Sequence, residues 1–192
     1  MSGRAVHEIE TASYAILRSR MDTTALPPLT RAVVERVVHA SADLDYVADL
    51  VCDEAALSRG VAALRDGAPI VADVHMVAAG ITAQPAVCRI RDAAPGPGET
   101  RAAAGIRLAS TSVGPGAVWV IGCAPTALFA LLDLDTEPAL VVGLPVGFVG
   151  ASDSKAALRA SGLPAVSNVS AKGGAAVAAA AVNALLYVEV QP

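Results

Sequence analysis

The sequence predicts a three-layer α/β/α fold, in which helices cover both faces of a five-stranded parallel sheet. Two all-apolar runs, at residues 117–121 and 139–143, each lead through a turn containing glycine or proline into an alanine-rich helix. Runs that are apolar on both faces are typical of central strands in a parallel sheet. The repeated succession of strand and helix, with right-handed crossovers, indicates a doubly wound sheet.

Residues 1–66 are predicted to form an N-terminal helical segment. The spacing of apolar residues predicts helices over residues 8–20, 29–41, 46–52 and 54–65. In the second of these we expect Thr30 as the N-cap and a buried stripe made of Val33, Val34, Val37 and Val38. The Gly67-Ala68-Pro69 stretch then ends the helical pattern.

Residues 67–192 are predicted to form the doubly wound core. We expect its strands over residues 69–72, 86–90, 117–121, 139–143 and 164–169. We expect its helices over residues 73–79, 100–110, 123–132, 151–160 and 174–187. A flavodoxin-like order, 2-1-3-4-5, places a switch point between the first strand and the third. No linker long enough to separate two domains is visible, so residues 1–192 are predicted to be a single domain.

Composition argues against several classes of protein. The 192 residues carry a formal net charge of −4, and Lys155 and Lys172 are the only lysines. A nucleic-acid-binding face needs clustered basic residues, so we expect no nucleic-acid partner. The N-terminus lacks the apolar core of a signal peptide, and no apolar run is long enough to cross a bilayer. We therefore expect a soluble protein without a membrane partner.

The three cysteines, Cys52, Cys88 and Cys123, are widely spaced. They form neither a disulfide framework nor a zinc pattern, which favours the reducing cytoplasm. No set of carboxylates and histidines has metal-ligand spacing, so we expect no metal site. Cys123 follows an expected strand and could line a pocket, but a small buried apolar role is more usual for cysteine.

The glycine turns are candidates for holding an anion. Gly143, Gly147 and Gly150 lie where backbone amides could point at a ligand near a helix N-terminus. Lys172, Gly173 and Gly174 combine a cation with exposed amides at another expected helix start, which suits a carboxylate or a phosphate. Alternatively, these glycines only let strand, turn and helix meet closely, and Lys172 is a solvated charge. The spacing of a nucleotide phosphate loop is absent.

Two side chains outside these turns are candidates for chemistry. His39 lies opposite the valine stripe of its expected helix, in the last turn, with Glu35 four residues earlier. The helix dipole and Glu35 both favour the imidazolium form, which suits a proton donor. Arg101, at the start of a helix, suits a substrate carboxylate. The alternatives are an exposed histidine and a surface ion pair between Arg101 and Glu99 or a neighbouring acid.

The order of motifs resembles a known family. VVHAS, GAPIVADVHMVAAGIT, TRAAAGI, IGCAPTALFALL, GLPVGFVGASDSK and KGGAAVAAAAVNAL follow one another between residues 9 and 185. This succession resembles the precorrin-8X methylmutases of cobalamin biosynthesis. The resemblance implies an isomerase that moves a methyl group between adjacent carbons of ring C of a tetrapyrrole. The product would be hydrogenobyrinate from precorrin-8X, or cobyrinate from cobalt-precorrin-8.

The resemblance also implies a mode of action. Members are flavodoxin-like homodimers that hold the tetrapyrrole at the subunit interface and use no separate cofactor. It assigns catalysis to His39, which protonates or hydrogen-bonds the macrocycle while the methyl group migrates. It places Ser13, Thr82 and Arg101 in the substrate pocket. The implied substrate carries many carboxylates, which suits the candidates chosen above for anion binding: Lys172, Gly173, Gly174 and Gly147.

The chain departs from the family pattern at two positions. Cys123 stands where the family commonly has Asn, and Ala175 stands where it commonly has Ser after the glycine pair. Each change removes a polar contact that the resemblance would otherwise imply. Two other functions remain open at this point: a carrier that binds a corrinoid without converting it, and a flavin protein. The flavin protein is disfavoured because Phe148 is the only aromatic residue in the loops after these strands.

Overall fold

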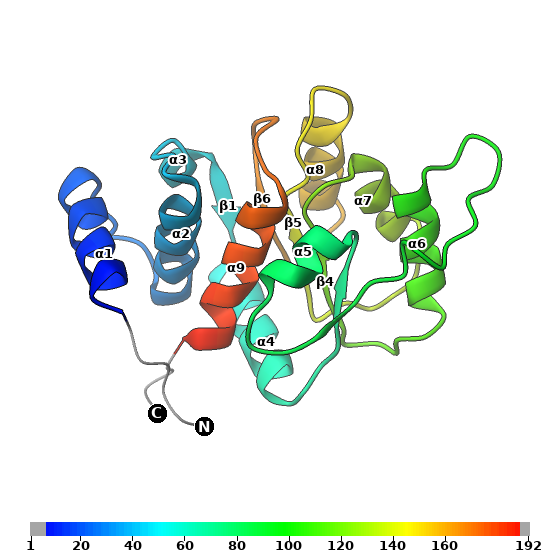
Figure 1. The fold of residues 1–192 in the computed structure, drawn as a ribbon, viewed down its shortest axis with the longest axis horizontal. Helices are drawn as coiled ribbons and strands as arrows, with labels where there is room; N and C mark the ends of the chain where they lie inside the picture. Colours follow the sequence, from blue (N-terminus) through cyan, green and yellow to red (C-terminus); the bar gives the residue numbers. More distant parts are fainter. Residues whose placement is uncertain (1–6, 189–192) are drawn as a thin grey trace.

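A six-stranded sheet lies between layers of helices in the computed structural model, which describes residues 7–188 (Figure 1). The outermost residues of the predicted domain, 1–6 and 189–192, lie outside the described residues. The strand order is β1-β6-β5-β4-β2-β3. The α/β class that the sequence predicts is therefore confirmed.

Five strands run parallel and correspond to the five expected ones. They are β2 (Ile70–Ala72), β3 (Ala86–Val87), β4 (Val118–Ile121), β5 (Leu140–Gly143) and β6 (Ala165–Asn168). Within the sheet these five follow one another as β3-β2-β4-β5-β6, the relative order expected from the sequence. Every residue of β2, β4 and β5 is buried, because helices cover both faces of these strands.

The sixth strand corrects the prediction of a five-stranded, all-parallel sheet. Residues 46–52 were expected to form one helix, but only Tyr46–Asp49 is helical (α3), and Leu50–Cys52 forms β1. This strand pairs antiparallel with β6, with Val51 opposite Ser167. The edge of β6 offers backbone partners that the apolar Leu50-Val51-Cys52 run can use, so tertiary pairing outweighs local helix preference.

The two faces of the sheet carry different helices. In β4, Val118 and Val120 face the cluster that contains α4 (Glu54–Arg65) and α9 (Ala175–Tyr187), whereas Trp119 and Ile121 face the opposite cluster. That second cluster contains residues from α6 (Arg101–Ser110), α7 (Pro125–Leu132) and α8 (Ala151–Ala160). The short α5 (His75–Gly80) packs against α9 on the first face.

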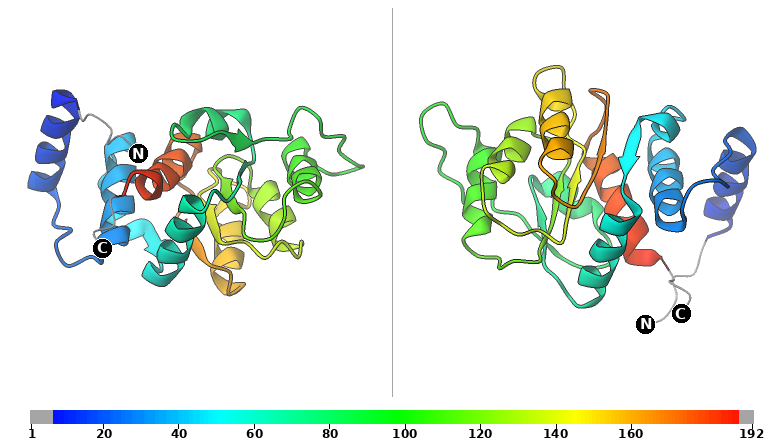
Figure 2. Two further views of the ribbon diagram at one scale, coloured as in Figure 1. Left: turned by 90° about the horizontal axis from the view of Figure 1, so that it is seen from below. Right: turned by 180° about the vertical axis from the view of Figure 1, so that it is seen from behind.

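The first two helices lie at one end of the molecule. Helix α2 (Pro28–Ser41) packs on α9 and α4, and its valine stripe is buried as expected. Helix α1 (Glu8–Arg20) packs on α2 and lies farther from the sheet, as Figures 1 and 2 show. His39 therefore reaches the surface on the side of α2 where α1 lies.

The N-cap expected at Thr30 is wrong. Helix α2 begins at Pro28, and its first free amides, on Leu29 and Thr30, donate to the Glu54 carboxylate at 2.8 Å each. The Thr30 hydroxyl also donates to Glu54, at 2.7 Å. A carboxylate from α4 thus caps α2 in place of a local side chain, which sequence spacing cannot reveal. Within residues 7–188, no helix is long and apolar enough to span a membrane.

Candidate active site

His39 is held at one ring nitrogen. It lies half-buried in the last turns of α2, and Ser13 Oγ from α1 lies 2.9 Å from its Nδ1. If the serine hydroxyl donates to Nδ1, a neutral imidazole carries its proton on Nε2. If the ring is an imidazolium, Nδ1 donates to Ser13 and Nε2 still carries a proton. In both cases Nε2 is the nitrogen left to donate to a ligand, whereas in a neutral ring protonated on Nδ1 it would be an acceptor.

The Glu35 carboxylate is bonded to side chains other than His39. One carboxylate oxygen accepts from Arg18 at 2.7 Å, and the other accepts from Arg31 at 2.8 Å and from Thr23 at 2.7 Å. Burial raises the pKa of Glu35, but these hydrogen bonds outweigh burial and lower the pKa to about 2. Glu35 therefore stays ionised and fastens α1 and the following linker to α2.

The Lys172 side chain is already paired. Its Nζ lies 2.8 Å from Asp43 and 2.6 Å from Asp45, just beyond the C-terminus of α2. Hydrogen bonds to these two carboxylates raise the pKa of Lys172 well above its usual range. The pairs bring the loop after β6 beside the end of the helix that carries His39. They also reduce the charge that Lys172 can offer to a substrate carboxylate.

The glycines beside Lys172 are packed against the loop after β5. A Cβ on Gly173 would come within 2.6 Å of the Pro145 carbonyl oxygen, and its φ of 153° disfavours any other residue. The Gly174 amide donates to Leu144 O at 2.9 Å, and the Gly147 amide donates to Ala171 O at 3.2 Å. Close packing, the alternative considered for these turns, accounts for Gly173, whereas positive φ values of 127° and 147° favour glycine at positions 174 and 147. Two of the expected anion-binding amides are used within the protein.

A buried lysine that the sequence analysis did not single out organises this loop. Lys155 Nζ donates to Asn168 Oδ1 at 2.8 Å and to the carbonyl oxygens of Ser170 and Lys172 at 2.5 Å and 2.7 Å. Burial lowers the pKa of Lys155 to about 8. Asn168 in turn donates to Asp49, whose carboxylate also accepts from the backbone and hydroxyl of Ser170. In the sequence, the only sign of this buried lysine was the Ser-Lys pair at positions 154–155.

Arg101 is exposed at the start of α6, on the face of the sheet opposite α2. The proposed alternative, an ion pair with Glu99, is wrong, because Glu99 pairs with Arg107 at 2.8 Å. Within residues 7–188, Arg101 makes no ion pair. Its guanidinium is therefore available to an external carboxylate.

Thr82 lies far from the Lys172 loop. Its amide donates to Asn183 Oδ1 at 3.2 Å, and its hydroxyl lies 2.9 Å from the Tyr187 hydroxyl, near the C-terminus of α9. The Gly174 turn precedes the N-terminus of the same 13-residue helix, about 20 Å away. One chain thus brings Ser13 to His39 and Gly147 to the Lys172 turn, but leaves Arg101 and Thr82 apart from them.

Comparisons with known proteins identify the family. Residues 8–188 match the family model described as Precorrin-8X methylmutase. The chain belongs to the precorrin-8X methylmutase family. The Cobalt-precorrin-8 methylmutase of Methanocaldococcus jannaschii is 42% identical over 163 residues, which cover 80% of this chain and 77% of that protein. The Precorrin-8X methylmutase of Pseudomonas aeruginosa is 40% identical, covering 95% and 94% of the two chains.

A solved structure supports the same relationship. The precorrin-8X methylmutase of Thermus thermophilus superimposes with a TM-score of 0.83 at 32% identity, covering 93% of each chain. Sequence and structure therefore both support membership of the methylmutase family over almost the whole chain.

In the turn after β4, Cys123 is partly buried. Burial raises the pKa of the Cys123 thiol, so it is not set up as a nucleophile. The turn is held instead by buried Asp73, which accepts from the amides of Gly122, Cys123 and Ala124 at 3.1, 2.8 and 2.9 Å. An aspartate directly after a buried strand was the signal for this contact.

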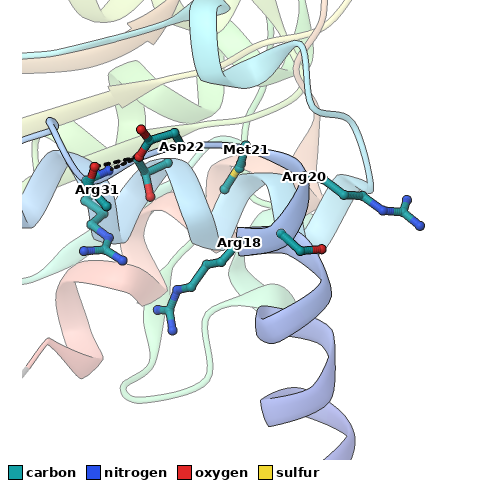
Figure 3. A pocket seen from close by; sticks show the side chains of 8 residues that line it. Arg18, Arg20, Met21, Asp22 and Arg31 are labelled. Atoms are coloured by element: carbon teal, nitrogen blue, oxygen red, sulfur yellow. Dashed lines mark hydrogen bonds between the residues drawn. The ribbon is translucent and has the colours of Figure 1, made fainter.

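A cavity of about 380 Å³ lies at the junction of α1 and α2 (Figure 3). It is lined by residues 18–24 and Arg31, and includes none of the predicted site residues. Arg18 and Arg31 are both paired with Glu35, and Arg20 points away from them (Figure 3). Within the described part of the chain, no group of three or more His, Cys, Asp or Glu could hold a metal ion. The candidate site residues therefore lie outside this cavity, and Arg101 and Thr82 lie apart from His39 within one chain.

Proposed function

We propose that this protein is an isomerase of cobalamin biosynthesis that moves a methyl group between adjacent carbons of ring C of its substrate. The substrate is precorrin-8X or cobalt-precorrin-8, and the product is hydrogenobyrinate or cobyrinate. The observation that carries the proposal is the family match across residues 8–188. It is supported by the His39 imidazole, whose Nδ1 is held by Ser13 while Nε2 is left to work on a ligand.

In the proposed reaction, His39 Nε2 donates a proton or a hydrogen bond to the macrocycle. The bond from the methyl group to one ring carbon breaks as the bond to its neighbour forms, in a sigmatropic shift. Substrate and product have the same composition, so a proton that His39 gives must return to it before the next turnover. Donation to the macrocycle stabilises the charge that develops during migration. The reaction needs no separate cofactor.

We propose that the remaining candidates bind the substrate. Arg101 pairs with a substrate carboxylate, because its guanidinium is exposed and has no acidic partner in the described residues. Ser13 and Thr82 contribute hydroxyl groups. Gly147, Lys172, Gly173 and Gly174 shape the wall formed by the loops after β5 and β6. Lys172 contributes less charge than the sequence suggested, since Asp43 and Asp45 already neutralise it.

The separation of these residues favours a homodimer with the site at the subunit interface. His39 and Arg101 lie on opposite sides of the sheet, so a second copy can supply one of them to the same tetrapyrrole. Large apolar side chains are exposed: Phe148 and Val149 in the loop after β5, and Ile9 and Ile16 on α1. Such side chains are suited to burial against a partner.

Three broader assignments belong to the same proposal. The parallel part of the sheet is assigned to the flavodoxin-like topology. The chain is assigned to one domain, because side chains of α2 and α4 share a core with the sheet and α9. The site of action is the cytoplasm, where the pathway's tetrapyrroles are made and the three free cysteines would stay reduced.

The test is conversion of substrate by the purified protein. Visible spectra after incubation with metal-free precorrin-8X and with cobalt-precorrin-8 should show a product spectrum with at least one of them. Relatives of similar identity carry both names, so this comparison also assigns the natural substrate. A spectrum that shows binding without conversion of either substrate would identify a corrinoid carrier and contradict the proposal.

A further inference from the structure

We infer that Tyr14 is a positioning residue for His39, an inference that rests on the proposed role of His39 as proton donor. The phenol ring of Tyr14 lies flat against the imidazole, with ring centroids 4.9 Å apart and planes inclined by 9°. Ser13, the preceding residue of α1, holds Nδ1 of the same ring at 2.9 Å. One adjacent pair of residues therefore fixes an edge and a face of the imidazole.

Tyr14 is itself held by two guanidinium groups. The Arg18 guanidinium carbon lies 5.4 Å from the centroid of the phenol ring, and Arg36 Nη1 lies 3.5 Å from the hydroxyl oxygen. Arg36 also pairs with Glu10, one turn before Tyr14 on α1, and their side chains are only 20% and 14% exposed. These contacts restrain the phenol at its face and at its hydroxyl. A restrained phenol can in turn restrain the ring stacked on it.

The stack restricts a motion that the Ser13 hydrogen bond leaves open. The χ2 torsion of histidine has a broad energy minimum, so a single contact at Nδ1 lets the ring pivot and swing Nε2 away from a ligand. A parallel aromatic ring at 4.9 Å limits this pivot. Its electron-rich face also attracts the ring when it is positively charged. Tyr14 therefore aims Nε2 without touching the substrate.

Two substitutions separate stacking from the hydroxyl contact. Tyr14→Leu keeps apolar bulk but removes the ring, and we expect kcat to fall by about tenfold or more while KM changes little. Tyr14→Phe keeps the ring and loses only the contact with Arg36, so it should restore most of kcat. In NMR spectra, the ring protons of His39 should be shifted upfield by the stacked ring in the wild type and in Tyr14→Phe. This ring-current shift should disappear in Tyr14→Leu.

Leu17→Ala is the matched control for the attachment of α1. Leu17 is buried on the same helix, so its truncation loosens α1 without removing the stacked ring. The same selective loss of kcat in Leu17→Ala would assign the effect to general loosening and overturn the inference. A wild-type kcat in Tyr14→Leu, with His39→Ala inactive, would overturn it as well. An active His39→Ala would instead overturn the proposed function, and this inference with it, so the two failures can be told apart.

Discussion

The α1–α2 pair and the loop after β6 hold their polar side chains in different ways. Between the helices, partly exposed Arg18 and Arg31 converge on the buried carboxylate of Glu35. In the loop, the fully buried ammonium of Lys155 is surrounded by neutral oxygen acceptors. The helix pair leaves one nitrogen of His39 to act on a ligand, whereas the loop uses several of its own donors. In the proposed function, the helices therefore carry the chemistry and the loop gives the site its shape.

The largest expected effect is a loss of stability when the Lys155 hydrogen bonds in the loop after β6 are removed. Lys155→Met removes the donor shared by Asn168 Oδ1 and the carbonyl oxygens of Ser170 and Lys172. Leaving these buried acceptors without a donor should lower the free energy of unfolding by about 3 kcal/mol, as measured by urea denaturation. Lys172→Met is the control, because its ion pairs are exposed and its loss should be clearly smaller. Equal losses of unfolding free energy in Lys155→Met and Lys172→Met would contradict a special role for the buried lysine.

On the helix side, Glu35→Gln should destabilise the protein in a pH-dependent manner. The pKa of Glu35 is lowered from 4.5 to about 2 in the folded state, so its ionised form stabilises the fold above pH 4.5. The loss at neutral pH should be about 2 kcal/mol, and the difference from wild type should shrink as the pH falls from 4.5 towards 2. Chemical denaturation of both proteins across this range measures it. A difference that stays constant with pH would show that Glu35 is not held as an ion by its arginines.

The smallest of the three effects concerns substrate binding. Arg101→Ala should leave the free energy of unfolding almost unchanged, since Arg101 is exposed and makes no ion pair within the described residues. It should lower kcat/KM by about tenfold through loss of a charge-assisted hydrogen bond to a carboxylate. Arg107→Ala on the same helix is the control, because Arg107 is engaged by Glu99. A loss of similar size in Arg107→Ala would argue against a specific role for Arg101.

The fold was predictable where local pattern and tertiary environment agree. The limits of α1 and α4 match the expected ranges, because periodic apolar spacing ends at clear boundaries there. The prediction failed at β1, where the edge of β6 turns Leu50–Cys52 into a strand. It also failed at the start of α2, which is capped by Glu54 from another helix. Both failures come from partners that are distant in the sequence.

The candidate site was predictable to a similar degree. The position of His39 opposite the valine stripe follows from helical geometry, and the structure places it there, half-buried. Its contact with Ser13 and its stack on Tyr14 depend on how α1 crosses α2, which spacing does not reveal. The Lys172 ion pairs likewise join residues more than a hundred positions apart. Residue type therefore indicated the hydrogen-bond donors, but only the fold shows which of them are already paired within the protein.

Single-turnover conversion by His39→Ala tests the central claim most directly. The substituted protein should bind the coloured tetrapyrrole as the wild type does but convert it at least about 10³-fold more slowly, because the proton donor is missing. His75→Ala, which removes an exposed histidine at the start of α5, should convert at the wild-type rate. Conversion by His39→Ala within about tenfold of the wild-type rate would contradict the assignment of chemistry to the α1–α2 pair.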